Sequence, residues 1–530
     1  MNPPKDQSRW PTLARMAVAL IAGGAQAASM AWPMSFQAAY LQLLGLHPGQ
    51  PVWWLQLLAL ALLVGVLRGT RSWRQAALSG WLFGTAWLLG SVGWTFVSLH
   101  TYGGLPAPLA ALAVLGLSAL LALYYAAACA IFVALMPAYR PWAAVVFAAL
   151  WLLAELMRGT WLTGFGWGAS GYAQVDGPLA GYAPWLGVYG LCAMSAWLAI
   201  TLAHAWQGGS WRDRVRGLAA PLVLLLLPFA YSVGAPELST ASGRLSVTLL
   251  QGNIAQDEKF QADSGVPKAL QWYAEQMKNS RTALVIAPET AIPVLPQQLP
   301  PDYWEALQQR FGTGQQAALI GSPLGNYQQG YTNSVVGLKP GQAQPWRYDK
   351  QHLVPFGEFI PPFFKWFTAM MNIPLGDFNR GAVKQAPFEW QGQKLAPNIC
   401  YEDLFGEELA LQFADPALTP SIFVNVSNLA WFGNSLAMDQ HLQIARLRAK
   451  EFERPIVLAT NTGVTAIVDH RGAVVVAAAR DTRTVLVGEV EGRSGVTPYV
   501  WWVSRLGLWP LWLLALGFVL LALRAKLRKR

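Results

Sequence analysis

The sequence predicts a membrane-embedded bundle of α-helices joined to an α/β domain outside the membrane. Hydrophobic residues occupy 54% of the 530 positions and charged residues only 12%, well below the charged fraction of soluble proteins. Seven of the eight apolar segments long enough to cross a bilayer precede residue 240. Beyond residue 244, strand-like runs alternate with helical stretches, which indicates a layered α/β domain.

The predicted spans share an apolar composition and a length that suits a bilayer. They cover residues 16–32, 51–68, 76–99, 107–136, 142–157, 184–206, 217–234 and 506–523. The segment 35–46 is shorter and is expected at the membrane interface. The first span contains Ala25-Gln26-Ala27, which has the small-residue pattern of a signal-peptide cleavage site. We expect this span to be retained, because further spans follow it directly.

Basic residues near the span ends predict the orientation of the bundle. One side carries the basic residues before position 16, those of the 68–74 loop, Arg140, those of the 212–216 loop and those after position 523. The opposite side carries only Arg158 and Arg505 near its span ends. By the positive-inside rule, both termini are cytoplasmic and the α/β domain faces outward. The net charge of +10 is thereby explained as a topology signal, and no nucleic-acid partner is expected.

Four parts are predicted along the chain. They are a seven-span bundle at 1–234, a linker at 235–243, the α/β domain at 244–497, and a final span with a basic cytoplasmic tail at 498–530. Strands of the α/β domain are expected at 245–250, 283–286, 317–320, 421–426, 456–459, 464–468 and 485–490, and helices at 268–278, 302–311 and 438–452.

Cys400 is the first candidate for a catalytic residue. It lies between an apolar run, 395–399, and a helix-like segment, 404–413. This places it at a strand-to-helix turn, where backbone N–H groups stabilise a thiolate. Cys129 and Cys192 lie inside apolar spans, so Cys400 has no evident disulfide partner. The alternative is a buried structural cysteine.

A carboxylate and an amine are the candidate partners of this thiol. Glu289 follows the apolar run 284–286 and is expected to act as the base that takes the thiol proton. Lys350 lies among polar and aromatic residues and is expected to hold the negative charge that develops on an attacked carbonyl oxygen. A capping or surface carboxylate and an exposed loop lysine are the alternatives.

The order Glu, Lys, Cys resembles the catalytic triad of the nitrilase, or carbon–nitrogen hydrolase, superfamily. Over nearly the whole chain the sequence is more narrowly similar to the apolipoprotein N-acyltransferase family, the membrane-bound branch of that superfamily. The motifs that carry this resemblance, in family order, are Gln251-Gly252-Asn253-Ile254, Pro288-Glu289, 350–359, Ile399-Cys400-Tyr401-Glu402, Val426-Ser427-Asn428, 430–433 and Thr460-Asn461-Thr462-Gly463. At two positions where the family often has tryptophan, this chain has Ala287 and Phe260, which are also apolar.

The resemblance implies a nitrilase α-β-β-α sandwich and a two-step acyl transfer. The donor it implies is a membrane phospholipid, whose sn-1 acyl chain passes to Cys400 as a thioester. The acceptor it implies is the α-amino group of the S-diacylglyceryl cysteine that begins an apolipoprotein. Glu358 resembles the family's additional active-site glutamate, and Tyr401 and Glu402 are expected to be supporting residues because they follow Cys400 directly. The resemblance also implies a bacterial inner membrane with the catalytic domain in the periplasm. The scattered histidines predict no metal site, and no cofactor is expected.

Other residues are candidates for contact with lipid or substrate. The apolar stretch 361–371 contains Lys365 and Trp366 and is expected to act as a lid that reaches the bilayer surface, with core packing as the alternative. Trp431 and Phe432 are expected to form an aromatic wall, and Asn333 belongs to a further motif that resembles a family site motif.

Arg158 is an additional candidate, because a charge near a span needs a partner or a function. An ion pair with Glu155 is the simple explanation, and a phospholipid headgroup is the alternative.

Two other functions remain open from the residues alone. A membrane-tethered amidase or nitrilase would use the same thioester and release its acyl group to water. A transporter or receptor with an outer ligand-binding domain would need polar or broken spans, and apart from Glu155 and Arg158 the spans carry little of that kind.

Overall fold

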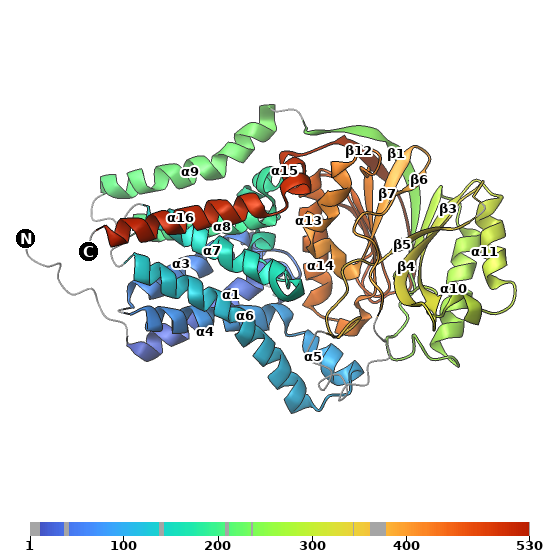
Figure 1. The fold of residues 1–530 in the computed structure, drawn as a ribbon, viewed down its shortest axis with the longest axis horizontal. Helices are drawn as coiled ribbons and strands as arrows, with labels where there is room; N and C mark the ends of the chain where they lie inside the picture. The colour runs from blue at the N-terminus through green and yellow to red at the C-terminus, as the bar shows by residue number, and fades with distance from the viewer. Residues whose placement is uncertain are drawn as a thin grey trace, which may run out of the picture. The chain divides into compact units, whose positions relative to one another are not determined.

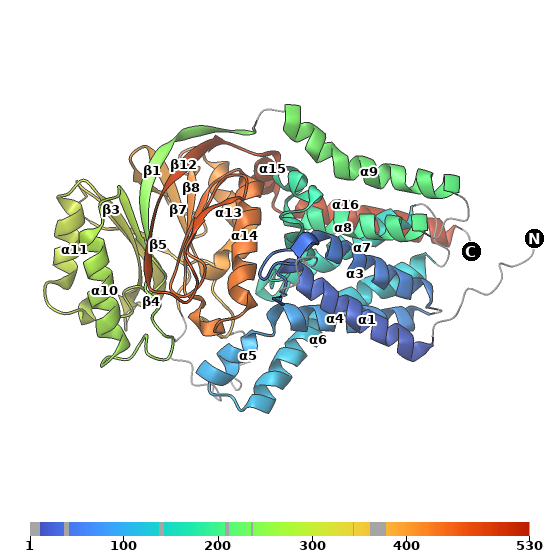
Figure 2. The same ribbon diagram turned by 180° about the vertical axis from the view of Figure 1, so that it is seen from behind.

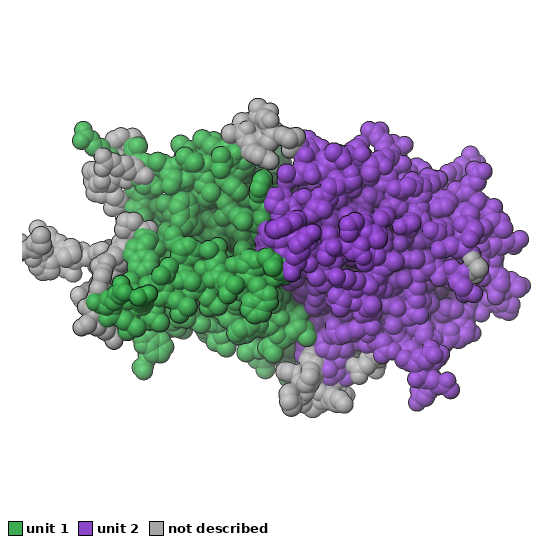
Figure 3. All heavy atoms as spheres, turned by 45° about the horizontal axis from the view of Figure 1, so that its top comes forward, with its two compact units in different colours: residues 1–93, 108–236, 506–530 green, residues 94–107, 237–505 purple. Residues whose placement is uncertain are grey.

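The computed structural model describes residues 11–35, 42–70, 72–136, 142–206, 211–234, 237–342, 344–360 and 378–528. The chain forms two compact units (Figure 3). The first contains residues 1–93, 108–236 and 506–530, and the second contains residues 94–107 and 237–505. The predicted lid with Lys365 and Trp366 lies outside the described residues.

Helices make up the first unit. They are α1 (Thr12–Met30), α3 (Trp53–Arg68), α4 (Trp73–Val92), α6 (Ala107–Leu135), α7 (Ala143–Thr160), α8 (Ala183–Trp206), α9 (Trp211–Gly234) and α16 (Trp509–Leu527). Five helical segments of the described chain are long and apolar enough to span a membrane, and a sixth is added if α4 and its 64° bent continuation, Thr95–Tyr102, count as one span. The sequence predicted eight spans. Two of the predicted spans correspond to apolar helices that are shorter than these. They are α3, which lies between Pro51 and Gly69, and the apolar part of α9, Gly217–Pro228.

Two six-stranded sheets form the centre of the second unit (Figure 1). Their strand orders are β12-β1-β2-β3-β4-β5 and β11-β10-β9-β8-β7-β6. The strands are β1 (Ser239–Gln251), β2 (Leu284–Ala287), β3 (Ala317–Asn326), β4 (Gly330–Leu338), β5 (Trp346–Asp349), β6 (Phe388–Trp390), β7 (Gln393–Ile399), β8 (Ile422–Ser427), β9 (Ile456–Thr460), β10 (Ala466–Val468), β11 (Val474–Ala477) and β12 (Thr484–Gly495). Each predicted strand is therefore confirmed.

Helices cover the outer faces of both sheets, which gives four layers (Figures 1 and 2). On the first sheet, α10 (Gly265–Asn279) and α11 (Tyr303–Gly312) bury apolar side chains such as Tyr273 and Phe311. The second sheet carries α13 (Gly406–Leu409) and α14 (Leu436–Phe452) on its outer side. Between the sheets, side chains of both, such as Leu249 and Val424, form one buried core. The predicted α-β-β-α sandwich is confirmed.

Strand direction brings polar residues to one edge of this sandwich. In the first sheet β1, β2 and β3 are parallel, and in the second β7, β8 and β9 are parallel. Glu289 follows β2, and Cys400 follows β7. β5 pairs antiparallel with β4, which pairs antiparallel with β3, so Lys350 follows a strand that ends at the same edge. Ligand sites of open α/β sheets commonly lie at such carboxyl ends.

A short segment from the first third of the chain also belongs to the second unit. It contains α5 (Thr95–Val97) and the π-helical turn Ser98–Tyr102. Trp94 donates from its indole to Gln440 Oε1 at 3.0 Å, and Ser98 Oγ donates to the carbonyl of Trp431 at 2.7 Å. The rings of Trp94 and Phe432 lie 4.3 Å apart. This segment was predicted as the end of a span and the loop after it, and the structure shows that it packs on the α-β-β-α sandwich.

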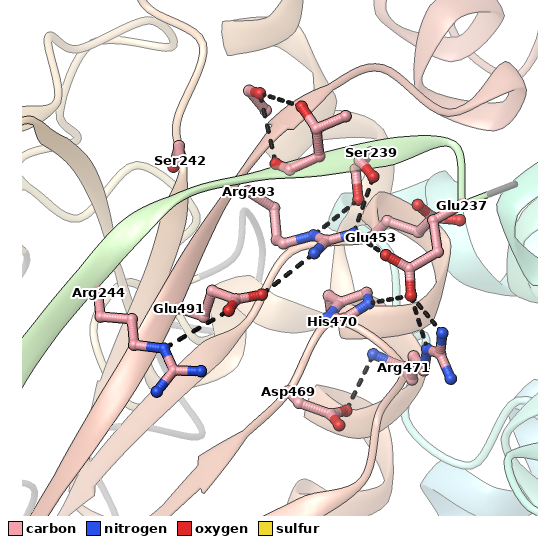
Figure 4. Close-up of polar contacts among 12 residues, drawn as sticks. Glu237, Ser239, Ser242, Arg244, Glu453, Asp469, His470, Arg471, Glu491 and Arg493 are labelled. Atoms are coloured by element: carbon pink, nitrogen blue, oxygen red, sulfur yellow. Dashed lines mark hydrogen bonds and ion pairs between the residues drawn. The ribbon is translucent and has the colours of Figure 1, made fainter.

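Ion pairs hold the first residue of the segment 237–505 in the second unit (Figure 4). The Glu237 carboxylate accepts hydrogen bonds from Arg471, His470 and Arg493. These bonds, that of Arg471 above all, lower the pKa of Glu237 to about 2. β1 begins two residues later, at Ser239, inside the stretch 235–243 that was predicted to be a linker.

Candidate active site

Cys400 lies at a strained turn directly after β7. Its φ of +54° is in the left-handed region that non-glycine residues rarely adopt, and the 3₁₀ turn Cys400–Leu404 begins there. Its main-chain carbonyl accepts a hydrogen bond from Asn425 Nδ2 at 3.2 Å. The side chain is 9% exposed and borders the core between the sheets. A strained, tightly held backbone of this kind is typical of functional residues.

A buried histidine supports the same turn. His441, on α14, donates from its ring to the carbonyl of Cys400, and its Nε2 lies 3.0 Å from Asp403 Oδ2. Burial lowers the pKa of His441, but Asp403 and the hydrogen bonds raise it by more, so its pKa is above the usual value. The His441–Asp403 pair therefore holds the imidazole ring against the backbone of Cys400 and favours its protonated form.

Glu289 is held in one orientation by two amide donors. Its Oε1 accepts from Asn333 Nδ2 at 2.7 Å, and its Oε2 accepts from the main-chain N–H of Asn428 at 2.8 Å. Gly321 allows β3 to approach this turn, since a Cβ at Gly321 would lie 2.2 Å from the carbonyl oxygen of Pro288. The carboxylate is 7% exposed, so it is a fixed, nearly dry acceptor for a proton.

Lys350 lies between two carboxylates. Its Nζ is 2.9 Å from the Glu358 carboxylate and 3.5 Å from Glu289 Oε1. Asn333 Nδ2 also bridges the two carboxylates, because it donates to Glu358 Oε1 at 2.8 Å as well as to Glu289. Asn333 was predicted as a lower-ranked substrate contact, and here it organises the charged groups themselves.

These charges set the resting state of the thiol. Burial and the negative charge of Glu289 raise the pKa of Cys400 well above its usual value, while Lys350 acts in the opposite direction. Burial lowers the pKa of Lys350, but Glu358 and Glu289 raise it by more, so Lys350 stays an ammonium. Cys400 is therefore a thiol at rest, and it becomes a nucleophile when a neighbouring base removes its proton.

Glu402 ties the ends of two strands together. Its Oε2 accepts from the N–H of Ile399 at 2.6 Å and from Tyr348 Oη at 2.9 Å, and its Oε1 accepts from the N–H groups of Gln351 and His352 at 2.6 and 3.1 Å. One carboxylate thus connects the end of β7, before Cys400, to the segment around Lys350. The supporting role predicted for Glu402 is therefore to hold these two segments together by hydrogen bonds.

Replacing Glu402 with glutamine is expected to lower the free energy of unfolding by about 3 kcal/mol, because the new NH₂ group faces hydrogen-bond donors that lose their acceptor. Thermal unfolding of the purified protein measures this. Glu408→Gln is the matched control, since Glu408 is more exposed and its donors among the described residues are the side chains of Gln351 and His352. Equal loss in the two variants would contradict the special role of Glu402.

Three sequence segments, around Ile254, Asn428 and Asn461, are joined by a network of polar side chains next to Glu289. Asn461 Nδ2 donates to the carbonyl of Ile254 and to Asn428 Oδ1, at 2.8 and 3.0 Å. Asn428 Nδ2 donates to Gln256 Oε1 at 2.8 Å. The network fixes the backbone N–H of Asn428 that holds Glu289.

The predicted aromatic residues make different contacts. Tyr401 packs against the rings of His352 and Phe405, at 5.7 and 5.2 Å. Trp431 contacts Tyr102, with ring centroids 5.8 Å apart, and Phe432 packs on Trp94 and on the core between the sheets. Trp431 and Phe432 therefore join the loop after Asn428 to the 94–102 segment.

Arg158 lies inside the first unit and is 1% exposed. It donates to Glu155 Oε2 at 2.8 Å, to Tyr125 Oη at 2.9 Å, and to the carbonyls of Phe165 and Trp167. This geometry matches the ion pair that was the simpler of the two interpretations.

The described residues contain no group of three or more histidine, cysteine, aspartate or glutamate side chains that could hold a metal ion. The site is instead a cluster of thiol, carboxylate, amine and amide groups from both sheets.

Several residues of this site were not predicted. His441, Asp403 and Asn425 support Cys400, and Lys259, which is described below, contacts Glu289. One signal was present for His441, since it is a histidine within the predicted helix 438–452.

A buried thiol, a carboxylate and an ammonium at one edge of a four-layer sandwich define the second unit as a carbon–nitrogen hydrolase domain. In agreement, the family model described as carbon-nitrogen hydrolase matches residues 246–499. The chain is also similar to solved structures at low sequence identity. One is a carbon-nitrogen hydrolase from Helicobacter pylori (16% identity, TM-score 0.34, covering 51% of this chain and 94% of that chain). Another is the C. elegans NitFhit protein (18% identity, TM-score 0.37, covering 49% of this chain and 63% of that chain).

The first unit places the chain in one branch of that class. The model described as apolipoprotein N-acyltransferase N-terminal domain matches residues 38–201. Proteins named apolipoprotein N-acyltransferase are 54% identical in Verminephrobacter eiseniae, over 92% of each chain, and 43% identical in Ralstonia nicotianae, over 90% of each chain. The chain belongs to the apolipoprotein N-acyltransferase family.

Proposed function

We propose that this protein moves the sn-1 acyl chain of a membrane phospholipid to the α-amino group of the S-diacylglyceryl cysteine that begins an apolipoprotein. The observation that carries the proposal is the position of Glu289 and Lys350 around the buried thiol of Cys400, in a chain that belongs to this family over nearly its full length. No cofactor is required, because each step is a proton transfer or a displacement at a carbonyl.

In the first step Glu289 takes the proton of the Cys400 thiol, and Sγ bonds to the carbonyl carbon of the ester. The ammonium of Lys350 stabilises the negative charge on the carbonyl oxygen. The bond between that carbon and the glycerol oxygen then breaks, and Glu289 returns the proton to the leaving oxygen. The products are a lysophospholipid and a thioester on Cys400.

In the second step the α-amino nitrogen of the acceptor attacks the thioester carbon. Glu289 takes a proton from this nitrogen, the carbon–sulfur bond breaks, and Cys400 regains its proton. The acyl chain ends as an amide. Two half-reactions through one covalent intermediate give ping-pong kinetics.

The membrane arrangement is part of the proposal. Eight spans are formed by α1, α3, α4 with its bent continuation, α6, α7, α8, α9 and α16, with both termini in the cytoplasm. The catalytic sandwich then faces the periplasm of a bacterial inner membrane. The basic residues on the cytoplasmic side of these helices support this orientation.

Intact-protein mass spectrometry tests the covalent step. After incubation with phosphatidylethanolamine that carries a labelled sn-1 chain, the full-length protein is expected to gain the mass of one acyl group, located on the Cys400 peptide. Hydroxylamine is expected to remove it, because thioesters are cleaved by that reagent. A labelled product without a thioester intermediate would contradict the proposal.

The amidase alternative differs in the fate of the acyl group. In the absence of an acceptor peptide, a hydrolase would release labelled fatty acid steadily, whereas a transferase is expected to stop after one acyl group per protein. Addition of a diacylglyceryl peptide with a free amino terminus is then expected to discharge the thioester. The family membership of the chain gives no support to the transporter alternative.

A further inference from the structure

Lys259 is a second buried lysine beside the candidate active site. It lies in the turn after β1 and is 2% exposed. Its Nζ donates to the main-chain carbonyl of Glu289 at 3.0 Å. A lysine is almost never so buried without a partner or a function, and this partner belongs to the residue that acts as the base in the proposed reaction.

The environment of Lys259 differs from that of Lys350. Lys350 lies between two carboxylates, whereas the hydrogen-bond acceptor found for Lys259 among the described residues is a neutral carbonyl. Burial therefore lowers the pKa of Lys259 to about 7, against the charges of Glu289 and Cys400, which raise it. Above neutral pH, Lys350 is therefore charged and Lys259 is neutral. Lysines of one site with pKa values this different typically have different roles.

We propose that Lys259 is a positioning residue for the Glu289–Cys400 pair, which holds the carbonyl of Glu289 in place and supplies a second positive charge that favours loss of the Cys400 proton. The proposal rests on the function proposed above. It adds a residue to the proposed active site. The roles of Glu289 and Lys350 were predicted from the sequence, whereas the role of Lys259 is inferred from its place in the structure.

The electrostatic part of this role follows from reciprocity. If the negative charge of a Cys400 thiolate stabilises the ammonium of Lys259, then the ammonium stabilises the thiolate by the same amount. The other charges near this pair come from different elements. Lys350 follows β5 and contacts Glu289, and Glu358 and Asp403 act on Cys400 as negative charges. His441 of α14 contacts the backbone of Cys400, and Glu258, next to Lys259, pairs with Lys268 of α10.

The pH dependence of Cys400 alkylation separates a charge effect from simple packing. The full-length protein in detergent micelles is treated with N-ethylmaleimide between pH 5.5 and 9, and the rate is read from the mass of the Cys400 peptide. Lys259→Met removes the charge at every pH. The wild-type residue carries its charge below pH 7 and loses it above. We expect the variant to react about tenfold more slowly at pH 6, which corresponds to about one pKa unit, and to approach the wild-type rate at pH 8.5.

Two further variants complete the test. Lys259→Arg keeps a positive charge throughout this pH range, so its profile is expected to lack the step near pH 7 that the wild type shows. Lys268→Met is the matched control, because Lys268 is a half-exposed lysine whose Nζ pairs with Glu258 at 2.6 Å. Its profile is expected to follow the wild type. If Lys259→Met does not fold, as judged by thermal unfolding, comparison of Lys259→Arg with the wild type still tests the step.

The outcomes distinguish this proposal from the proposed function. A deficit of Lys259→Met that is the same at all pH values would show a structural role only and would overturn the electrostatic assignment. Equal profiles for all variants would overturn it as well. If the wild type forms no acyl adduct on Cys400 while the alkylation profiles are as expected, the proposed function fails and the assignment of Lys259 stands.

Discussion

Replacing Cys400 with alanine is expected to abolish acyl transfer. Cys400 is the nucleophile of the proposed mechanism, and loss of the nucleophile from a comparable covalent site lowers kcat by roughly 10⁶-fold. The substitution removes one sulfur from a side chain that is already buried, so the fold is expected to persist. Transfer of a labelled acyl chain to a diacylglyceryl peptide, measured with purified protein in phospholipid micelles, checks this.

Cys129→Ala is the matched control for this experiment. Cys129 is also a free, buried cysteine, but it lies on α6 of the first unit. The control is expected to keep transfer within a few-fold of the wild type and to form the acyl adduct. Retention of substantial transfer by Cys400→Ala would refute the thioester mechanism.

Lys350→Met is expected to damage both catalysis and stability. The variant keeps the length of the side chain but leaves the buried carboxylates of Glu289 and Glu358 without their cation. Breaking a buried ion pair from one side costs about 3–5 kcal/mol of unfolding free energy. Loss of the charge that stabilises the carbonyl oxygen lowers kcat by a further factor of about 10²–10³. Thermal unfolding and single-turnover acylation measure the two effects separately.

A double variant separates these effects. In Lys350→Met with Glu358→Gln, one negative charge is removed together with the cation, so part of the lost stability is expected to return. The rate of acylation is not expected to return, because the charge near the carbonyl oxygen is still absent. Recovery of acylation in the double variant would show that Lys350 acts only by neutralising Glu358.

Seven of the twelve strands, and the meeting of Glu289, Lys350 and Cys400 at one edge, could be predicted because they depend on local pattern. Apolar runs followed by a single polar residue marked the ends of β2 and β7, and these ends supply Glu289 and Cys400. Parallel strands in a sandwich then bring such ends together without further information. Lys350 was predicted from the polar and aromatic residues around it in the sequence, although the strand before it, β5, was not predicted.

Other features depend on contacts that no local pattern reveals. Asn333 lies on β4, an antiparallel return strand, so its place between Glu289 and Glu358 follows only from the register of that strand with β3. Lys259 looks like any loop lysine in the sequence, and its importance comes from burial. Two of the eight predicted spans correspond to apolar helices shorter than the others, α3 and the Gly217–Pro228 part of α9, and α9 contains Pro221 and Pro228.

The segment 94–107 has a consequence for the order in which the protein is made. Trp94 and Gln440 are 346 positions apart, and Ser98 and Trp431 are 333 apart. During synthesis the segment therefore waits until more than three hundred further residues have been added before its aromatic side chains find their partners. A nascent chain that stops before residue 429 therefore lacks the residues that Trp94 and Ser98 contact in the folded second unit.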